Sequence, residues 1–539
     1  MTDLRTGGQW VVDALAAEGV RHVFGIPGVH NLAIYDALIR QSAIRHILTR
    51  HEQGAAFMAD GYARASGRPG VLAVTTGPGA TNALTPLVES FATSQPVLAI
   101  MSDIPAALIG RHLGALHEVS NQIDCFRPVT RWAETVREGP AIAPAVQRAF
   151  ERFRSARPGP VALSIPTDLL MAPTAGALHP PRGARPRCDA ALITRAADLL
   201  RGARRPLLIA GGGVVAAGAG DHVRALSRRL HAPVLTTVMG RGTLPETDPL
   251  WLGVLPNRLA SQAALEAADV ILAVGCRFAH RSTKGLLLNL NFRTEQALIH
   301  LDLDPEEIGR QHTAAIGIVG DARDGLAGLL AALGKEAAVS QWDWAALARE
   351  RGARWARWTE TVDRLIHILR DGVAPDAIMV NDQTGLNYWM EWHYPVLAPR
   401  TFLYPVGSAT LGYAVPAAIG AAVAEPRRQV VAVVGDGGFL FSVNELATAA
   451  KYSLPIVFLV LNDNRYGAIK YLQEEMFAGR WGETELANPD FPALARAFGL
   501  EGRRVETVDD LGGALEKALT HGGPTVLELP VAITPPWEL

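Results

Sequence analysis

The segment VVAVVGDGGFLFSVNELATAAKYSLPIVFLVLNDN, residues 430–464, decides the fold of this chain. Residues 430–434 form a short β-branched apolar run that ends at a glycine turn, which is typical of a buried parallel strand. Residues 444–452 have a helical pattern that ends before Pro455, and residues 456–461 form a second apolar run. The pattern predicts a strand–helix–strand unit of a parallel sheet.

An acidic residue follows each of these two strands. Asp436 lies in the turn GDGG at 435–438, and Asp463 lies in NDN at 462–464. Because parallel strands end at the same edge of a sheet, we expect both carboxylates in the crevice where ligands of open α/β sheets bind. Two side-chain oxygens, a backbone carbonyl and a water suit Mg²⁺, which is usually shared with a phosphate group. The alternative is an ordinary strand–helix–strand unit with a tight turn, since short glycine motifs are common.

Composition limits the class of protein. At 539 residues the chain is long enough for roughly three domains. Its hydrophobic content of 49% and charged content of 19% indicate a large core rather than disorder. The net charge of −2 argues against a nucleic-acid-binding protein, because such domains carry a clear basic excess.

The cysteines and the apolar runs indicate the compartment. Cys125, Cys188 and Cys276 are far apart and form no CxxC pair, which is typical of a reduced cytoplasmic protein without structural zinc. The chain opens with an amphipathic helical pattern at 8–18 rather than a signal peptide. No apolar run reaches about 18 residues, so we expect no transmembrane span and a cytoplasmic location.

Strand and helix patterns alternate in three blocks, residues 1–175, 190–335 and 361–539. Residues 172–190 are rich in Pro, Ala and Arg and lack periodicity, which predicts a linker, and residues 335–360 are predicted to form a helical bridge. Repeated strand–helix–strand units at this spacing predict an α/β protein of three doubly wound domains with parallel sheets.

The first and third blocks share a faint repeat. In the first block, GPG at 77–79 precedes a helix and the apolar run 96–103. In the third block, GDG at 435–437 precedes a helix and the run 455–463. We therefore expect the two blocks to share one topology, although all strand–helix–strand units have some similarity.

With these segments placed, the chain resembles thiamine-diphosphate (ThDP) enzymes of the acetolactate synthase and 2-oxo-acid decarboxylase superfamily over nearly its whole length. The similarity rests on GDG followed by NDN, and on RHEQGAAFMADGYARASG (50–67), TTGPGATN (75–82), LGYAVPAAIGAA (411–422) and NPDFPALARAFG (488–499). It implies a pyrimidine-binding first domain, a central domain and a diphosphate-binding third domain, with ThDP and Mg²⁺ as cofactors. It also implies a homodimer or a dimer of dimers, because each site of the family takes one domain from each of two chains.

Glu52 has the main catalytic role in this resemblance. The matching Glu of the family contacts a ring nitrogen of the aminopyrimidine and shifts that ring to the imino form, which removes the proton from thiazolium C2. From its position alone, Glu52 would be a surface glutamate at a helix start, where the helix dipole favours it.

The resemblance also assigns the metal ligands. Asp436 matches the first Mg²⁺ ligand, Asp463 stands where most relatives have Asn, and the carbonyl of Arg465 would be the third protein ligand. The added negative charge of Asp463 beside a diphosphate is either offset by Arg465 or Lys470, or it lowers the metal affinity.

Further residues match the cofactor site. Leu411 matches the bulky residue that holds ThDP in its bent conformation, although by itself it would be a core leucine. The carbonyl of Ala409 would accept from the 4′-amino group. Gly28, Gly77 and Asn82 are expected to shape the site, or as lone residues to form turns. The other cofactor-binding candidates are Thr384, Gly385 and Leu386, in a diphosphate-contact loop that matches poorly, and Gly435, Gly437, Gly438, Tyr466 and Gly467.

The resemblance implies decarboxylation of a 2-oxo acid to an enamine intermediate, then protonation to an aldehyde or carboligation to a second carbonyl. His117 stands where acetolactate synthases carry Gln. The triplet Leu-His-Glu in which it lies resembles that of guanidino-oxopentanoate decarboxylases. The imidazole of His117 favours protonation, or it serves only as a hydrogen-bonding group. His30 is the second catalytic candidate. Glu474 replaces the Trp of the acceptor pocket, and it either binds a cationic substrate end or is simply solvated.

The central block raises the question of a flavin. The three glycines at 211–213 lack GxGxxG spacing. Residues 275–278 resemble the flavin-binding region of acetolactate synthases, but residues 255–258 stand where their Met-His-Gly loop would be. We therefore expect no functional FAD.

Two rival functions follow from other features of the chain. A nucleotide-dependent (FAD or NAD) oxidoreductase would use the glycine turn at 211–213, and its extract would contain flavin or nicotinamide without ThDP. A non-enzymatic regulator would lack Glu52 or Asp436, and both are present. We expect a small 2-oxo acid as substrate, and neither a nucleic-acid nor a membrane partner.

Overall fold

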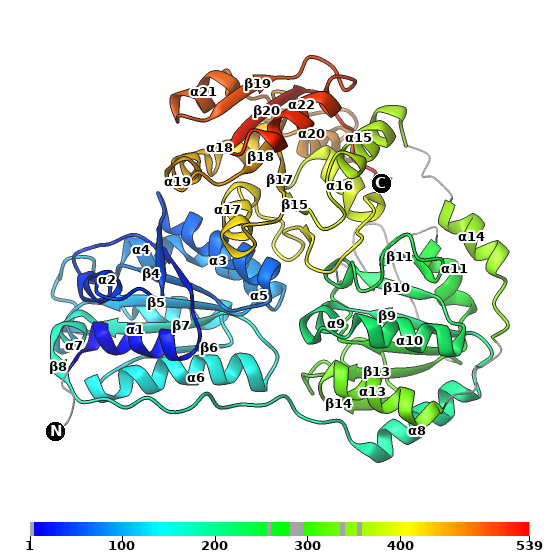
Figure 1. The fold of residues 1–539 in the computed structure, drawn as a ribbon, viewed down its shortest axis with the longest axis horizontal. Helices are drawn as coiled ribbons and strands as arrows, with labels where there is room; N and C mark the ends of the chain where they lie inside the picture. Colours follow the sequence, from blue (N-terminus) through cyan, green and yellow to red (C-terminus); the bar gives the residue numbers. More distant parts are fainter. Residues whose placement is uncertain are drawn as a thin grey trace.

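In a computed structural model of the protein, residues 5–255, 260–280, 293, 295–334, 340–352 and 358–537 are described. The chain folds into three lobes, each built around a six-stranded parallel sheet flanked by helices (Figure 1). The predicted fold class of three doubly wound α/β units is confirmed. Among the described residues, no helix combines the length and apolar character needed to cross a membrane.

The N-terminal lobe has the strand order β3-β2-β4-β5-β7-β6. Its strands are β2 His22–Gly25, β3 Arg45–Leu48, β4 Gly70–Val74, β5 Val97–Asp103, β6 Trp132–Thr135 and β7 Val161–Pro166. Its helices are α1 Gly7–Ala17, α2 Leu32–Ile39, α3 Glu52–Ser66, α4 Pro78–Asn82, α5 Leu84–Ala92, α6 Ile142–Ser155 and α7 Thr167–Met171, with short 3₁₀ turns η1 Ala106–Leu108, η2 Gln122–Cys125, η3 Arg127–Val129 and η4 Gly139–Ala141. Figure 1 shows α1 and α6 on one side of this sheet and α3 on the side that faces the C-terminal lobe.

The C-terminal lobe repeats this topology with the strand order β16-β15-β17-β18-β20-β19. Its strands are β15 Ile378–Asn381, β16 Phe402–Leu403, β17 Val430–Gly435, β18 Ile456–Asn462, β19 Glu501–Arg504 and β20 Thr525–Pro530. Its helices are α15 Glu360–Asp371, α16 Gly385–His393, α17 Ala414–Ala424, α18 Asp436–Leu440, α19 Leu446–Lys451, α20 Gly467–Met476, α21 Phe491–Ala497 and α22 Leu511–Thr520, with η6 Val443–Glu445. Counted along the chain, both sheets run second, first, third, fourth, sixth, fifth, so the expected shared topology is confirmed.

The central lobe has the different order β11-β10-β9-β12-β13-β14, which is the order of dinucleotide-binding domains. Its strands are β9 Pro206–Ala210, β10 Val234–Thr237, β11 Trp251–Leu255, β12 Val270–Val274, β13 Ala297–Asp302 and β14 Ile316–Val319. Its helices are α8 Ala190–Arg201, α9 Gly212–Ala217, α10 Gly220–Leu230, α11 Ala260–Ala267, α13 Ala322–Leu333 and α14 Trp344–Gly352, with η5 Val238–Gly240.

The two predicted connections differ in regularity. The linker at 172–190 is extended between the lobes, except that β8 Pro173–Thr174 pairs antiparallel with β1 Arg5–Thr6. Of the predicted helical bridge at 335–360, only α14 and the first residue of α15 are helical among the described residues. Residues 335–339 and 353–357 lie outside the described part of the chain.

Helices α3 and α17 join the N-terminal and C-terminal lobes. Side chains from these two helices and from both sheets form one continuous core. A Cβ on Gly61 would lie 2.2 Å from the carbonyl oxygen of Ala417, and a Cβ on Gly420 would lie 2.0 Å from that of Met58. The two helix backbones are therefore in direct contact, and the contact requires glycine at both positions.

We expect Gly61→Ala to lower the free energy of unfolding by about 1–3 kcal/mol, because the added methyl forces the two helices apart. Urea denaturation followed by circular dichroism measures this change. Gly513→Ala in α22 is the matched control, since a Cβ there meets no atom within 4 Å. The control should be neutral or raise stability by about 0.5–1 kcal/mol, and equal losses in both variants would contradict the close contact.

Candidate active site

The candidate residues gather where the strand order of a sheet reverses. In the N-terminal lobe this point lies between β2 and β4, and in the C-terminal lobe between β15 and β17. Loops at the carboxyl ends of such strands diverge to opposite faces, which leaves a crevice for ligands. The predicted pyrimidine-side residues follow β2, β3 and β4, and the predicted diphosphate-side residues follow β15 to β18, so each group lies at or next to a reversal point. We call the two groups the N-lobe and C-lobe half-sites.

Glu52 is the first residue of α3 in the N-lobe half-site. The preceding His51 caps the helix by accepting from the backbone N–H of Gln53. Asn82, at the end of α4, donates its side-chain amide to Oε2 of Glu52 at 3.0 Å. A Cβ on Gly79 would lie 3.3 Å from Oε1 of Glu52. The carboxylate is thus held at the helix N-terminus, where the dipole favours its charge.

The two predicted glycines of this half-site lie against the turn after β4. A Cβ on Gly28 would lie 2.8 Å from the Thr75 side chain. Gly77 has a φ of 67°, and a Cβ there would lie 2.5 Å from the carbonyl oxygen of His117. Close packing therefore favours glycine at both positions, and their site-shaping role stays a prediction.

The two predicted catalytic histidines lie side by side. The ring centroids of His30 and His117 are 5.3 Å apart. Nδ1 of each ring has no hydrogen-bond partner among the described residues. Burial, and then the neighbouring His117, lowers the pKa of His30, while Asp103 opposes the shift. His30 is therefore neutral near pH 7 and can both accept and donate a proton.

The C-lobe half-site places Asp436 and Asp463 at the ends of the adjacent strands β17 and β18, as predicted. Burial, and then the charge of Asp436, raises the pKa of Asp463 to about 6. Burial also raises the pKa of Asp436. A buried carboxylate beside a half-buried one whose charge it disfavours fits a divalent cation, which would stabilise both ionised forms. The described residues contain no cluster of three or more His, Cys, Asp or Glu.

Asn488 is a residue of this half-site that the sequence reasoning did not assign. Its side-chain amide donates to Oδ2 of Asp436 at 2.6 Å and to Oδ1 of Asn462 at 3.1 Å. It opens the motif NPDF, so the signal was present in the sequence, but nothing local connects it to a strand end some 50 residues earlier. Asn488 orients the Asp436 carboxylate.

Of the two cations expected to offset Asp463, Arg465 is the one that faces it. Nε of Arg465 lies 3.9 Å from Oδ2 of Asp463 and donates to the backbone oxygen of Asp463 at 3.0 Å. Nζ of Lys470 instead lies 3.9 Å from Oε1 of Glu474 and 3.5 Å from the ring centroid of Trp481. Glu474 is thus paired on its own helix and partly exposed.

The remaining cofactor-binding candidates form the walls of the C-lobe half-site. A Cβ on Gly435 would lie 3.0 Å from Oγ1 of Thr384, and one on Gly437 would lie 2.6 Å from the Tyr466 ring. Similar clashes account for the glycine at three more positions. A Cβ on Gly438 would meet Asp382, one on Gly467 would meet Asp463, and one on Gly385 would meet Ile533. Leu386 is fully buried in the core of this lobe, so its side chain is not available to a ligand.

The segment with Ala409 and Leu411 is held by a buried ionic network. Glu89 accepts from the backbone N–H of Ser408 at 2.6 Å and from Arg64 at 2.8 Å. Arg64 also pairs with Asp60 at 2.6 Å. Ala409 follows this anchor with a φ of 54° and is exposed, and Leu411 is half-buried. The N-terminal lobe therefore positions a loop of the C-terminal lobe.

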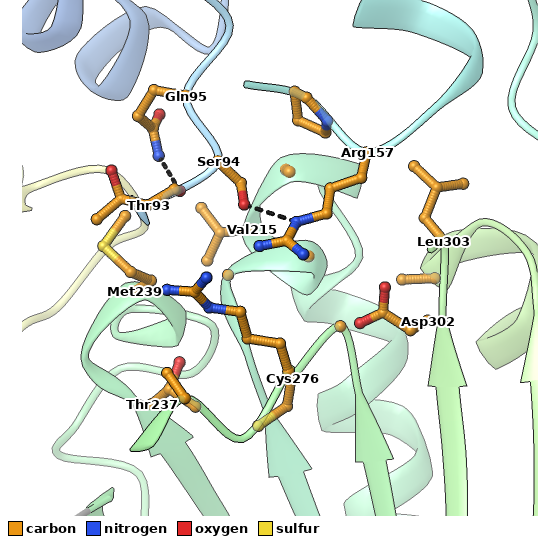
Figure 2. A pocket seen from close by; sticks show the side chains of 18 of the residues that line it. Thr93, Ser94, Gln95, Arg157, Val215, Thr237, Met239, Cys276, Asp302 and Leu303 are labelled. Carbon is orange, nitrogen blue, oxygen red and sulfur yellow. Dashed lines mark hydrogen bonds between the residues drawn. The ribbon is translucent and has the colours of Figure 1, made fainter. Parts of the chain in front are cut away.

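The central lobe has a cavity of about 370 Å³ at its own reversal point, between β9 and β12 (Figure 2). Figure 2 shows Arg157 entering it from the N-terminal lobe, where its Nε donates to Ser94 at 2.9 Å. The glycine turn after β9 packs on the turn after β12, since a Cβ on Gly211 would lie 2.0 Å from the carbonyl oxygen of Gly275. Backbone packing thus explains that glycine. Residues 256–258 of the loop expected to argue against a flavin lie outside the described residues, and the absence of FAD stays a prediction.

Comparison with known proteins connects these half-sites to a family. Residues 5–125 match the N-terminal TPP binding domain of thiamine pyrophosphate enzymes, residues 193–329 their central domain, and residues 382–529 their C-terminal TPP binding domain. The chain belongs to the thiamine pyrophosphate enzyme family, whose cofactor is ThDP. It is a thiamine-diphosphate-dependent enzyme of the decarboxylase and carboligase type.

Three relatives cover the chain almost completely. The protein named "Probable 2-ketoarginine decarboxylase AruI" from Pseudomonas aeruginosa is 40% identical over 97% of this chain and 94% of its own length. The acetolactate synthase isozyme 2 large subunit of Escherichia coli is 35% identical over 97% of this chain and 95% of its own. A "Probable acetolactate synthase large subunit" of Methanocaldococcus jannaschii is 35% identical over 97% and 91%. None of these matches supports the oxidoreductase alternative.

We expect Glu89→Gln to lower the free energy of unfolding by about 1–3 kcal/mol, because a neutral amide replaces the buried charged acceptor of Arg64 and Ser408. Urea denaturation gives the change in midpoint. Glu134→Gln is the control, because its pair with Arg148 at 2.8 Å is exposed. The control should cost about 1 kcal/mol or less, and a comparable loss in the two variants would contradict the role of the buried network.

Proposed function

We propose that this enzyme uses ThDP and Mg²⁺ to decarboxylate a 2-oxo acid and releases an aldehyde. The proposal rests on two observations. Asn82 holds the Glu52 carboxylate in one half-site, and the carboxylates of Asp436 and Asp463 lie close enough in the other for their charges to interact. In the overall reaction the bond from the keto carbon to the carboxylate breaks, CO₂ leaves and a proton takes its place. The reaction needs no oxidant.

The bound cofactor supplies a nucleophilic carbon and a sink for the electron pair of the broken bond. The chain supplies the rest. Asp436, Asp463 and the carbonyl oxygen of Arg465 would hold Mg²⁺, and the loop at 435–438 would admit the diphosphate against backbone N–H groups. Glu52 would hold a proton at the pyrimidine ring. Thr384 and Gly385 would contact the diphosphate, while the Ala409 carbonyl and Leu411 would orient the pyrimidine and the bend of the cofactor.

His30 and His117 would supply the proton that replaces CO₂. Their rings adjoin each other beside Gly77, and a neutral His30 can pass a proton to its neighbour. A pair of proton donors favours protonation over addition to a second carbonyl. The relative with 2-ketoarginine decarboxylase in its name supports the same outcome and makes a cationic 2-oxo acid the first substrate to test.

We also propose that two chains complete each site, as a homodimer or a dimer of dimers. Exposed apolar side chains border both half-sites, which is unusual for a surface in contact with water. They are Val29, Leu32, Leu113 and Leu116 beside the N-lobe half-site, and Phe441, Ile469, Phe477 and Trp481 beside the C-lobe half-site. An interface over both patches would exclude water from the cofactor.

The proposed domain limits are 1–175, 190–335 and 361–539, and the three family matches fall within them. Cys125, Cys188 and Cys276 form no disulfide, which supports a reduced, cytoplasmic location. The net charge of −2 supports a small-molecule substrate rather than a nucleic acid.

A panel of 2-oxo acids, including 2-ketoarginine and pyruvate, tests the reaction with ThDP and Mg²⁺ by scoring CO₂, aldehyde and acyloin separately. We expect CO₂ and aldehyde in equal amounts. Glu52→Gln should lower kcat by about 100-fold or more while ThDP still binds. His117→Asn should lower the release of aldehyde more than the release of CO₂. Acyloin as the main product of the unaltered enzyme would show a carboligase instead.

A double-mutant cycle tests the charge balance at the metal. Arg465→Gln should weaken ThDP binding at fixed Mg²⁺ by about two- to five-fold, because Asp463 then lies uncompensated beside the diphosphate and the lost pair is partly exposed. Adding Asp463→Asn should restore the affinity. Calorimetric titration measures both. Additive effects of the two substitutions would show that Arg465 does not offset Asp463.

A further inference from the structure

Glu445 is a fully buried carboxylate to which the proposed mechanism assigns no role. It ends η6, between α18 and α19 of the C-terminal lobe. Its Oε1 accepts from the backbone N–H groups of Arg50 at 3.1 Å and His51 at 3.0 Å. Its Oε2 accepts from the hydroxyl of Thr448 at 2.6 Å. The carboxylate thus binds the two residues that immediately precede Glu52.

The surroundings show that this contact is built into the fold. A Cβ on Gly54 would lie 2.1 Å from Oε1 of Glu445, so the glycine of the motif RHEQGAA makes room for this carboxylate. The hydroxyl of Tyr452 accepts from the backbone N–H of Leu48 at 2.8 Å. Together, η6 and α19 of the C-terminal lobe hold the whole connection from β3 to α3. Figure 1 shows α19 against the N-terminal lobe.

We propose that Glu445 is a positioning residue for Glu52: its ionised carboxylate fixes the start of α3, and thereby the geometry with which Glu52 reaches the cofactor ring. This inference rests on the proposed function of Glu52. An ionised carboxylate can accept all three hydrogen bonds, whereas a protonated one has less acceptor capacity and carries a hydrogen toward N–H groups. Loss of the anion would therefore loosen the residues before Glu52 without touching the C-lobe half-site.

The ionisation of Glu445 lies in an accessible pH range. Burial raises its pKa to about 7, opposed by the hydrogen bonds from Thr448, Arg50 and His51 and by the charge of Arg50. The other ionisable side chains on the packed elements are His51 and Glu52 at the start of α3, Asp60, Tyr62 and Arg64 further along α3, Arg45 and His46 on β3, and Lys451 and Tyr452 at the end of α19. Because the anion is the positioning form, Glu52 should work less well as the pH falls through about 7.

The test separates the action of Glu52 from cofactor binding. Exchange of the C2 proton of bound ThDP with D₂O, read by NMR after acid quench, reports the action of Glu52 without any substrate. Titration of ThDP and Mg²⁺ into the same protein, followed by tryptophan fluorescence, reports binding. The variants are Glu445→Gln, Thr448→Val and the exposed control Glu516→Gln.

We expect Glu445→Gln to slow C2 exchange by about 10- to 100-fold near pH 8, because a small displacement of a reacting group has effects of this size. The affinity for ThDP should change by less than about three-fold. Thr448→Val should slow exchange in the same direction but less, and Glu516→Gln should match the unaltered enzyme. The unaltered enzyme should lose exchange rate as the pH falls through about 7, and Glu445→Gln should lack this inflection.

Three results would overturn the inference. Exchange in Glu445→Gln equal to that of the unaltered enzyme would show that Glu52 does not depend on this carboxylate. A parallel loss of ThDP affinity and exchange would show a merely structural role, and so would an inflection retained in the variant. An unaltered enzyme that neither binds ThDP nor exchanges C2 would overturn the proposed function instead. Should Glu445→Gln fail to fold, Thr448→Val decides the question by the same two measurements.

Discussion

The contact between α3 and α17 is the constraint on which the two half-sites depend. Gly61 and Gly420 let the backbones of these helices touch, and the sheets of both lobes then share one core. Glu52 begins α3, and the Ala409 to Leu411 segment leads directly into α17. The same contact therefore fixes the position of the proposed catalytic carboxylate and of the proposed cofactor-binding loop, although these belong to different lobes.

Charge is distributed around this contact in two ways. In the network of Asp60, Arg64 and Glu89, two buried carboxylates share one buried guanidinium, and Glu89 also holds the backbone at Ser408. At the half-sites, by contrast, charge or hydrogen-bonding capacity is left over. Asp436 and Asp463 face each other, and the Nδ1 atoms of His30 and His117 have no partner in the described part of the chain. Buried polar groups that have partners hold the scaffold together, whereas groups without partners are the ones a ligand can satisfy.

The sequence was sufficient to predict the features that depend on local patterns and on family motifs. The fold class, the parallel strand ends at Asp436 and Asp463, and the shared topology of two blocks all follow from apolar runs and turns, and the structure has them. In the described part of the predicted helical bridge at 335–360, residues 340–343 and 358–359 are not helical, because the polar pattern there does not set a helix length. The roles of Asn488, Glu89 and Glu445 depend on partners far away in sequence, so no local pattern could assign them. Only the folded chain brings each to the group that it orients.

The repeated strand order of the outer lobes has a consequence for the history of the chain. Helix α3 follows the second strand of its sheet and α17 follows the second strand of the other, so the two helices are topological equivalents that pack on each other. Gly61 meets α17 and Gly420 meets α3, which is the reciprocity of an isologous contact. This arrangement is what the duplication and fusion of a self-associating ancestor would leave. The two equivalent helices now serve different half-sites, since α3 begins with Glu52 and α17 follows the segment of Ala409 and Leu411.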